Sequence, residues 1–138
     1  MNIKKIIYGT LAYSLITFPI AIIWHVVLFK EKYQAFGYFD GEPNFIIGLV
    51  TIIIQGLMLS FLYPYVSFPG KGIVRELKFA FVIGIFFWSS HVLALLAKQT
   101  VENPVTFAVM ESFYLMLQFG IFGILISLVY KETLNKSI

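Results

Sequence analysis

Apolar residues fill four long stretches of the chain, over residues 6–29, 44–66, 77–97 and 105–129, and all charged residues except Lys78 and Glu111 lie in the short segments between and beside them. Each stretch has the roughly 20 residues that cross a hydrocarbon core of about 30 Å at 1.5 Å per residue. Backbone groups in lipid must be hydrogen-bonded within their own segment. Each stretch is therefore predicted to be a transmembrane helix.

Composition agrees with this pattern. The chain has 138 residues, of which 59% are hydrophobic and 12% are charged, whereas about 25% of the residues of a soluble domain are charged. The longest connection, KEKYQAFGYFDGEPN, is too short for a separate soluble domain. We predict an all-α fold in which residues 1–138 form a single transmembrane domain, an integral membrane four-helix bundle. The aromatic residues of that connection are predicted to form an interfacial layer; they are Tyr33, Phe36, Tyr38 and Phe39.

The basic residues indicate the orientation, because cytoplasmic loops of membrane proteins carry an excess of lysine and arginine. With a cytoplasmic amino terminus, the outer segments hold Lys30, Lys32 and Lys98. This asymmetry predicts a multi-pass protein of a bacterial inner membrane with both termini in the cytoplasm. The net charge of +3 is then a topology signal, and we expect no nucleic-acid partner. The inner segments hold Lys4, Lys5, Lys71, Arg75, Lys78, Lys131 and Lys136.

The chain has no cysteine. This composition excludes disulfides, thiolate metal sites, covalent haem attachment and C-x-x-C redox centres. Four-helix thiol oxidoreductases of the membrane are thereby excluded as a class.

Each predicted helix carries one stripe of small and polar residues, at the spacing of three or four that places side chains on one helix face. On the first helix the stripe is Ser14, Thr17, Ala21 and His25. We expect the four stripes to converge inside the bundle, because polar groups are costly in lipid. The other stripes are Gly48, Thr51, Gln55 and Leu59 on the second helix, Ala80, Gly84, Trp88, His91 and Lys98 on the third, and Glu111, Tyr114 and Gln118 on the fourth.

Besides Lys98 at the outer boundary, three of these residues can carry a charge, and they lie at similar depth. Counted from the outer ends of their helices, His25, His91 and Glu111 are about 7 to 11 Å below the outer surface. A carboxylate at this depth must be neutral, paired or open to water. For each histidine alone, the simpler interpretation is an interfacial position at a helix end. The predicted site adds Trp24, Trp88, Tyr114 and Gln118 around the three residues and Gln55 near mid-membrane.

Two further patterns concern packing. The segments HVVLFK and QGLMLS in the first half correspond to HVLALLAK and QFGIFGILIS in the second. A duplication would relate two parallel hairpins by an axis along the membrane normal, although apolar sequence also aligns with itself by chance. A separate stripe on the fourth helix, formed by Gly120, Gly123 and Ser127, allows close approach of another helix. This stripe predicts packing within the bundle, or against another membrane subunit or a second copy of the chain.

Four classes of function remain open. An accessory or structural subunit of a larger membrane complex, without catalysis of its own, explains the short connections, and it is the function that we expect. The first alternative is binding or transport of a proton, an ion or a small ligand by His25, His91 and Glu111, because histidine titrates near neutral pH. The second is haem or a divalent metal held by the same residues. The third is a membrane enzyme on a lipid or sterol-like substrate, although the second carboxylate of four-helix sterol isomerase-like proteins is missing.

Three segments carry a resemblance. The runs WHVVLFKEKY in the first helix and QGLMLSFLYP in the second, and a glutamate in the fourth helix followed by LQFGIFG, are present here. With these segments the chain resembles small four-helix bacterial inner-membrane proteins that are grouped as domains of unknown function. The resemblance implies a fold and a location, and it implies no activity.

Overall fold

The computed structural model describes residues 2–66 and 68–131, which form helices joined by turns, with no strand among them. Four helical segments are long and apolar enough to cross a membrane. They cover Ile3–Leu28, Phe45–Tyr65, Ile73–Lys98 and Pro104–Tyr130. The predictions of an all-α fold and of four membrane-length helices are confirmed, as expected of a multi-pass membrane protein.

Each of the four segments contains one long α-helix. These helices are α1 (Ile3–Ile22), α3 (Phe45–Leu62), α4 (Ile73–Trp88) and α6 (Pro104–Tyr130). Shorter pieces complete the first three segments: the π-helical η1 (Ile23–Leu28), the 3-10 helix η2 (Tyr63–Tyr65), and the π-helical η3 (Ser89–Leu93) with α5 (Ala94–Lys98). A further short helix, α2 (Lys30–Ala35), follows η1.

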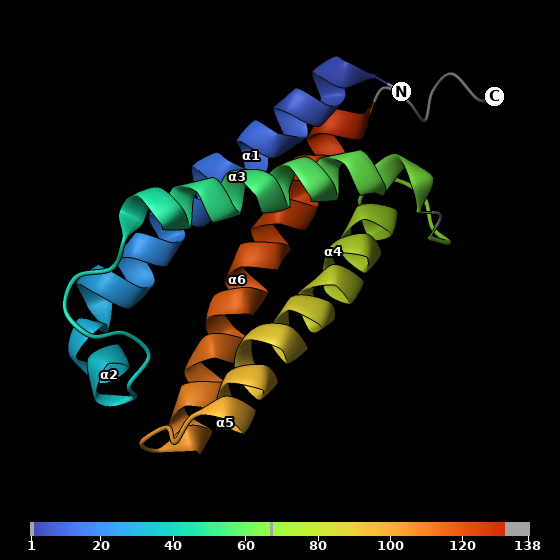
Figure 1. The fold of residues 1–138 in the computed structure, drawn as a ribbon. Helices are drawn as coiled ribbons and strands as arrows, with labels where there is room; N and C mark the ends of the chain where they lie inside the picture. The colour runs from blue at the N-terminus through green and yellow to red at the C-terminus, as the bar shows by residue number, and fades with distance from the viewer. Residues whose placement is uncertain (1, 67, 132–138) are drawn as a thin grey trace.

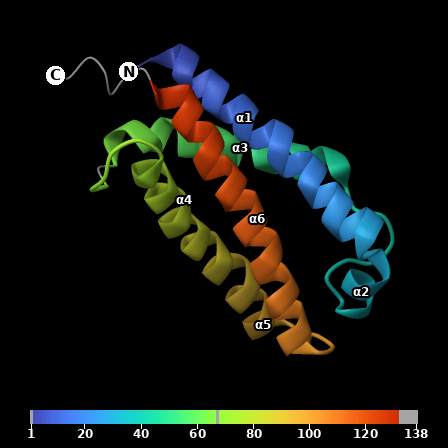
Figure 2. The same ribbon diagram turned by 180° about the vertical axis from the view of Figure 1, so that it is seen from behind.

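Three of the long helices form a row in the order α1, α6, α4, and α3 lies obliquely across one face of this row (Figure 1). Packing joins α1 with α3, α1 with α6, and α4 with α6, and both ribbon views show α6 between α1 and α4 (Figures 1 and 2). The first turn of α1 and the last turn of α6 lie at one end of the molecule, and α2 and α5 lie at the other. Because α3 packs extensively on α1 alone among the described helices and reaches α4 only at its carboxyl-terminal end, where Tyr63 packs against Phe79, we call this arrangement an open row.

Only part of the predicted polar stripe on α3 contacts another helix. The carboxyl-terminal half of its stripe, with Gln55 and Leu59, lies at the contact with α1. Thr51 is exposed, and its hydroxyl bonds to the carbonyl of Ile47 in the same helix. The expectation that the whole stripe from Gly48 to Leu59 faces the bundle interior is therefore wrong for its first half. The reason is that α3 packs extensively on α1 alone in the part of the chain that the structure describes.

Glycines set how closely the helices approach. A Cβ atom on Gly9 of α1 would lie 2.4 Å from Ser60 Oγ of α3, so only glycine fits at this crossing without a shift. A Cβ atom on Gly123 of α6 would lie 3.0 Å from the Ala80 side chain of α4. The small-residue stripe on α6 thus serves packing within the chain at Gly123. A Cβ atom on Gly120 would have no neighbour within 4 Å.

An apolar groove of about 680 Å³ lies between α4 and α6. Gly84 and Gly120 line it, together with Trp88 and Lys78. The remaining stripe residue, Ser127, donates its hydroxyl hydrogen to a carbonyl of its own helix. Of the stripe, Gly120 is therefore the member that borders open space.

Both histidines lie in π-helical turns. His25 belongs to η1, which follows α1, and His91 belongs to η3, which follows α4. Both turns lie at the end of the molecule that holds α2 and α5 (Figure 1). A π-helical turn is rare, and it often marks a functional position in an α-helix. The two hairpins thus share a local distortion at the same place, whereas the duplication itself stays a prediction.

Candidate functional site

The carboxylate of Glu111 is the centre of a hydrogen-bonded cluster. Its side chain is 0% exposed, and α6 carries it to the place where η1, α2 and η3 meet. His25 Nε2 lies 2.9 Å from Oε1, and His91 Nε2 lies 2.8 Å from Oε2. Tyr33 donates its hydroxyl hydrogen to Oε1. The structure thus brings together His25, His91 and Glu111 from three separate spans.

His25 and Glu111 share a proton. His25 Nδ1 lies 3.0 Å from the carbonyl oxygen of Ala21, which can only accept, so Nδ1 carries a hydrogen. Nε2 faces Glu111 Oε1. The hydrogen in that second contact belongs either to an imidazolium facing a carboxylate or to a carboxylic acid facing a neutral imidazole. In both arrangements the pair holds one exchangeable proton in a buried position.

His91 meets two partners through one atom. Its Nε2 lies 2.8 Å from Glu111 Oε2 and 2.9 Å from the hydroxyl oxygen of Tyr38. As a donor, Nε2 bonds to the carboxylate; as an acceptor, it receives the Tyr38 hydrogen. The His91 side chain is 35% exposed, so it connects the buried carboxylate with the protein surface. His91 is therefore the more exposed of the two imidazoles.

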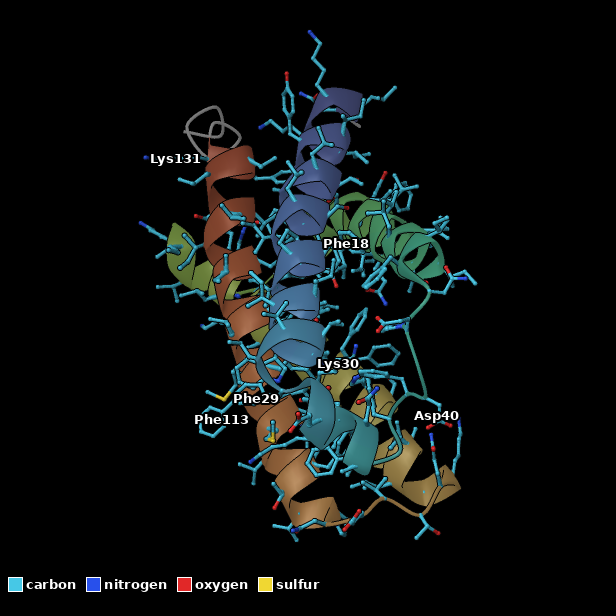
Figure 3. The ribbon with its side chains drawn as sticks, turned by 90° about the vertical axis from the view of Figure 1, so that its left-hand side faces the viewer. Phe18, Phe29, Lys30, Asp40, Phe113 and Lys131 are labelled. Carbon is cyan, nitrogen blue, oxygen red and sulfur yellow. The ribbon has the colours of Figure 1, made fainter. Side chains whose placement is uncertain are left out.

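Helix α2 closes the site. It begins directly after Phe29, where the backbone leaves the helical conformation, and Figure 3 shows Phe29 and Lys30 at this turn. Tyr33 is 0% exposed, and Phe36 packs edge-on against Phe107 of α6. Trp24 Nε1 donates to the Tyr33 hydroxyl at 2.8 Å.

The expected interfacial aromatic layer is therefore wrong for Tyr33 and Phe36, which are buried. The physical reason is that a phenol hydroxyl can enter the protein interior where a carboxylate accepts its hydrogen. The indole of Trp24 satisfies the same hydroxyl from the other side. The predicted neighbour Trp24 thus reaches Glu111 through Tyr33.

The phenols over the carboxylate stay protonated. Burial, followed by the negative charge of Glu111, raises the pKa of Tyr33 far above its usual value. The same two causes raise the pKa of Tyr38. Both hydroxyls therefore remain hydrogen donors throughout the range in which histidine changes charge.

We expect α2 to leave the site as the pH rises above about 10, the ordinary pKa of a phenol. Above that value the undocked form loses the Tyr33 proton, whereas the docked form, with its raised pKa, keeps it, so rising pH favours undocking. Trp24 fluorescence in a Trp88→Phe background measures the change. Adding Tyr33→Phe should weaken this transition, and adding Tyr38→Phe as well should remove it, because burial and Glu111 raise the pKa of both phenols. An alkaline transition that is unaltered in both variants would count against the assignment.

Of the residues predicted to surround His25, His91 and Glu111, some contact this cluster and others lie deeper. The Tyr114 ring packs edge-on against His25, with 4.5 Å between centroids. Gln118 and Gln55 meet deeper, through Tyr13: Gln118 Nε2 donates to the Tyr13 hydroxyl at 2.8 Å, and that hydroxyl donates to Gln55 Oε1 at 3.1 Å. A second polar contact therefore lies below the cluster.

Trp88 lies apart from the cluster. Its indole nitrogen donates to Ser112 Oγ at 2.9 Å, and its ring lines the groove between α4 and α6. The expectation that Trp88 surrounds the histidines is not met, because its position on α4 turns the ring toward that groove.

The metal and haem alternatives stay predictions. Each imidazole Nε2 bonds directly to a Glu111 oxygen. Within residues 2–66 and 68–131, no group of three or more His, Asp or Glu side chains is arranged to hold a metal ion. The donors as placed bond to one another, and they would have to separate to admit a metal.

Sequence reasoning missed Tyr13, Tyr33 and Tyr38 as parts of these polar contacts. Tyr13 precedes the stripe residue Ser14, so a stripe one residue wider would have included it. Tyr33 and Tyr38 lie in a connection, where helical spacing gives no information about direction.

Comparison of the chain with protein-family models, with curated proteins and with solved structures finds no match. The resemblance to small four-helix inner-membrane proteins therefore stays a prediction. The function has to be inferred from the geometry of the Glu111 cluster.

Proposed function

We propose that this is an inner-membrane protein that takes up and releases protons at the His25–Glu111–His91 centre. The observation that carries the proposal is the buried carboxylate with an imidazole nitrogen at 2.8 to 2.9 Å from each oxygen. A carboxylate and two imidazoles share protons near neutral pH with little change of structure. Tyr33, Tyr38 and Tyr114 are the other titratable groups around the carboxylate.

The orientation that we propose places both termini in the cytoplasm and α2 outside. The excess of lysine and arginine at the end of the molecule with the termini supports it, as cytoplasmic segments are the more basic. The proton centre, which lies near α2, then opens toward the outer face of the membrane. His91 is the member of the centre with the greatest exposure.

Labelling with ¹⁵N-histidine tests the proposal, because the chain has two histidines and both belong to the centre. Over the pH range in which the protein stays folded, we expect both Nε2 signals to change, in coupled steps because the rings share Glu111. His25 Nδ1 should stay protonated throughout. Glu102→Gln, at an exposed carboxylate, should leave the titration unchanged. Two rings that each keep one protonation state over this range would refute proton exchange.

The accessory-subunit role is the second candidate, and the open groove between α4 and α6 favours it. Gly84 and Gly120 would admit a helix of another membrane subunit there. Stoichiometric copurification that is lost in a Gly120→Leu variant would support this role. A partner retained by that variant would place the contact elsewhere.

A further inference from the structure

A second buried carboxylate lies at the opposite end of the molecule. Glu76 of α4 is 1% exposed. Tyr63 donates its hydroxyl hydrogen to Glu76 Oε1, and Arg75 Nε lies 3.4 Å from the same oxygen. Glu76 Oε2 has no hydrogen-bond partner among the described residues. A buried carboxylate that accepts from a phenol thus occurs near both ends of the bundle, with two imidazoles beside Glu111 and a guanidinium, which is always charged, beside Glu76.

Polar side chains continue from Glu111 toward the middle of the membrane. Tyr114 and Gln118 follow Glu111 on the same face of α6, at spacings of three and four residues. Gln118 bonds to Tyr13 of α1, and Tyr13 bonds to Gln55 of α3. These residues form a polar row across three helices.

The row continues from mid-membrane to Glu76. Ser60 follows Gln55 on α3 and is 0% exposed, and its carbonyl accepts from the Tyr130 hydroxyl at 2.8 Å. The Tyr130 ring packs against Tyr63, with 4.6 Å between centroids, and Tyr63 bonds to Glu76. Arg75 Nε donates a hydrogen bond to the Tyr63 hydroxyl, and the Arg75 side chain is 26% exposed. The row therefore ends at the surface of the chain.

Several oxygens along this row require further partners. Ser14 Oγ and Ser60 Oγ are buried and, like Glu76 Oε2, have no partner in the described part of the chain. Buried hydroxyls and carboxylates are normally hydrogen-bonded to protein or to water. Phe119, Phe122 and Ile126 are buried in the rest of this interior, so the unpartnered oxygens mark the places where water would have to enter.

The length of the row matches a membrane. From His25 to Gly9, which contacts Ser60, α1 and η1 rise by about 24 Å at 1.5 Å per residue, close to a hydrocarbon core of about 30 Å. Hydroxyl groups and water both donate and accept hydrogen bonds, so a chain of them can pass a proton by exchanging donor and acceptor roles. The amides of Gln118 and Gln55 hold the Tyr13 hydroxyl in place, and water beside the hydroxyls would carry the proton past the amides and the Ser60 carbonyl.

We propose that the protein conducts protons across the membrane along this row, between the His25–Glu111–His91 centre and Glu76. One proton enters from water at His91, and one leaves to water beside Arg75. No covalent bond changes, and the electrochemical gradient drives the movement. The proposal rests on the proposed proton exchange at Glu111, and it adds a second site and a route.

Proton flux into vesicles tests the route. The purified full chain is placed in lipid vesicles that contain a pH-sensitive dye, and a potassium gradient with valinomycin sets the membrane potential. We expect flux above that of protein-free vesicles. Tyr13→Phe, which removes the hydroxyl between Gln118 and Gln55, and Glu76→Gln should each reduce the flux to the protein-free level. Tyr8→Phe is the matched control on α1, because Tyr8 is 59% exposed, and it should retain the flux.

Two results would overturn the route: wild-type flux equal to that of protein-free vesicles, or undiminished flux in both Tyr13→Phe and Glu76→Gln. The histidine titration is measured on the same preparations. A normal titration without flux rejects the route and leaves the proton centre standing, whereas the loss of both rejects both. Circular dichroism and size-exclusion profiles equal to the wild type show that a variant is folded, and if Tyr13→Phe fails this criterion, Glu76→Gln decides.

Discussion

Replacing Glu111 with glutamine is expected to destabilise the protein by about 3–5 kcal/mol, the cost of leaving a buried charge without its partner. Glutamine has nearly the same shape, so packing is preserved. With the amide oxygen in the Oε1 position, His25 Nε2 either carries a proton without a counter-charge or directs a lone pair at that oxygen, because Nδ1 is committed to the Ala21 carbonyl. With the amide NH2 in that position, the Tyr33 hydroxyl loses its acceptor. Unfolding of the detergent-solubilised protein by a denaturing detergent, followed by circular dichroism, measures the loss.

Two comparisons make this result specific to the cluster. Glu102→Gln removes an exposed carboxylate two residues before α6 and should leave stability unchanged. The double change His25→Gln with Glu111→Gln removes both charges and should recover much of the loss, as replacing both partners of a buried pair is commonly tolerated. If Glu111→Gln is as stable as the wild type, the contacts of Glu111 do not hold the spans together.

Replacing Gly9 with valine is expected to separate α3 from α1. The new Cβ atom would lie 2.4 Å from Ser60 Oγ and 3.0 Å from Ser60 Cβ, and overpacking of this kind costs about 1–3 kcal/mol. The consequence is large because α3 packs extensively on α1 alone in the part of the chain that the structure describes. Denaturing-detergent titration measures stability, and a cross-link between cysteines introduced on α1 and α3 measures the contact.

Gly48→Val is the matched control, since a Cβ atom at Gly48 of α3 would meet nothing within 4 Å. It should leave the cross-link and the stability close to wild type. A Ser60→Gly change in the Gly9→Val background should restore part of the contact, because it removes the atoms that clash. Equal stability of Gly9→Val and Gly48→Val would show that α1 and α3 do not approach closely at Gly9.

The proton centre and the route make separate demands on the fold. The centre needs η1, α2, η3 and α6 at one end, whereas the route also needs the α1–α3 contact, because Ser60 and Gln55 lie on α3. Gly9→Val should therefore disturb the lower part of the polar row more than the histidine titration. Substitutions can therefore disturb the lower part of the polar row without disturbing the proton centre.

The sequence by itself determined the features that depend on local periodicity. A span is a matter of length and apolar content, so the four membrane helices could be located without knowledge of their neighbours. The stripe of Ser14, Thr17 and His25 is buried because three- and four-residue spacing fixes one helix face. Similar depth of His25, His91 and Glu111 followed from the constant rise of a helix.

Only the tertiary structure decided which faces meet. The open row leaves Thr51 of α3 exposed, and it turns Trp88 toward the groove between α4 and α6. The return of α2 onto the bundle buries Tyr33 against Glu111, a contact between residues 78 apart in the chain. The rotation of a helix about its axis and the path of a connection depend on contacts between distant segments, and the spacing of residues along one helix carries no information about them.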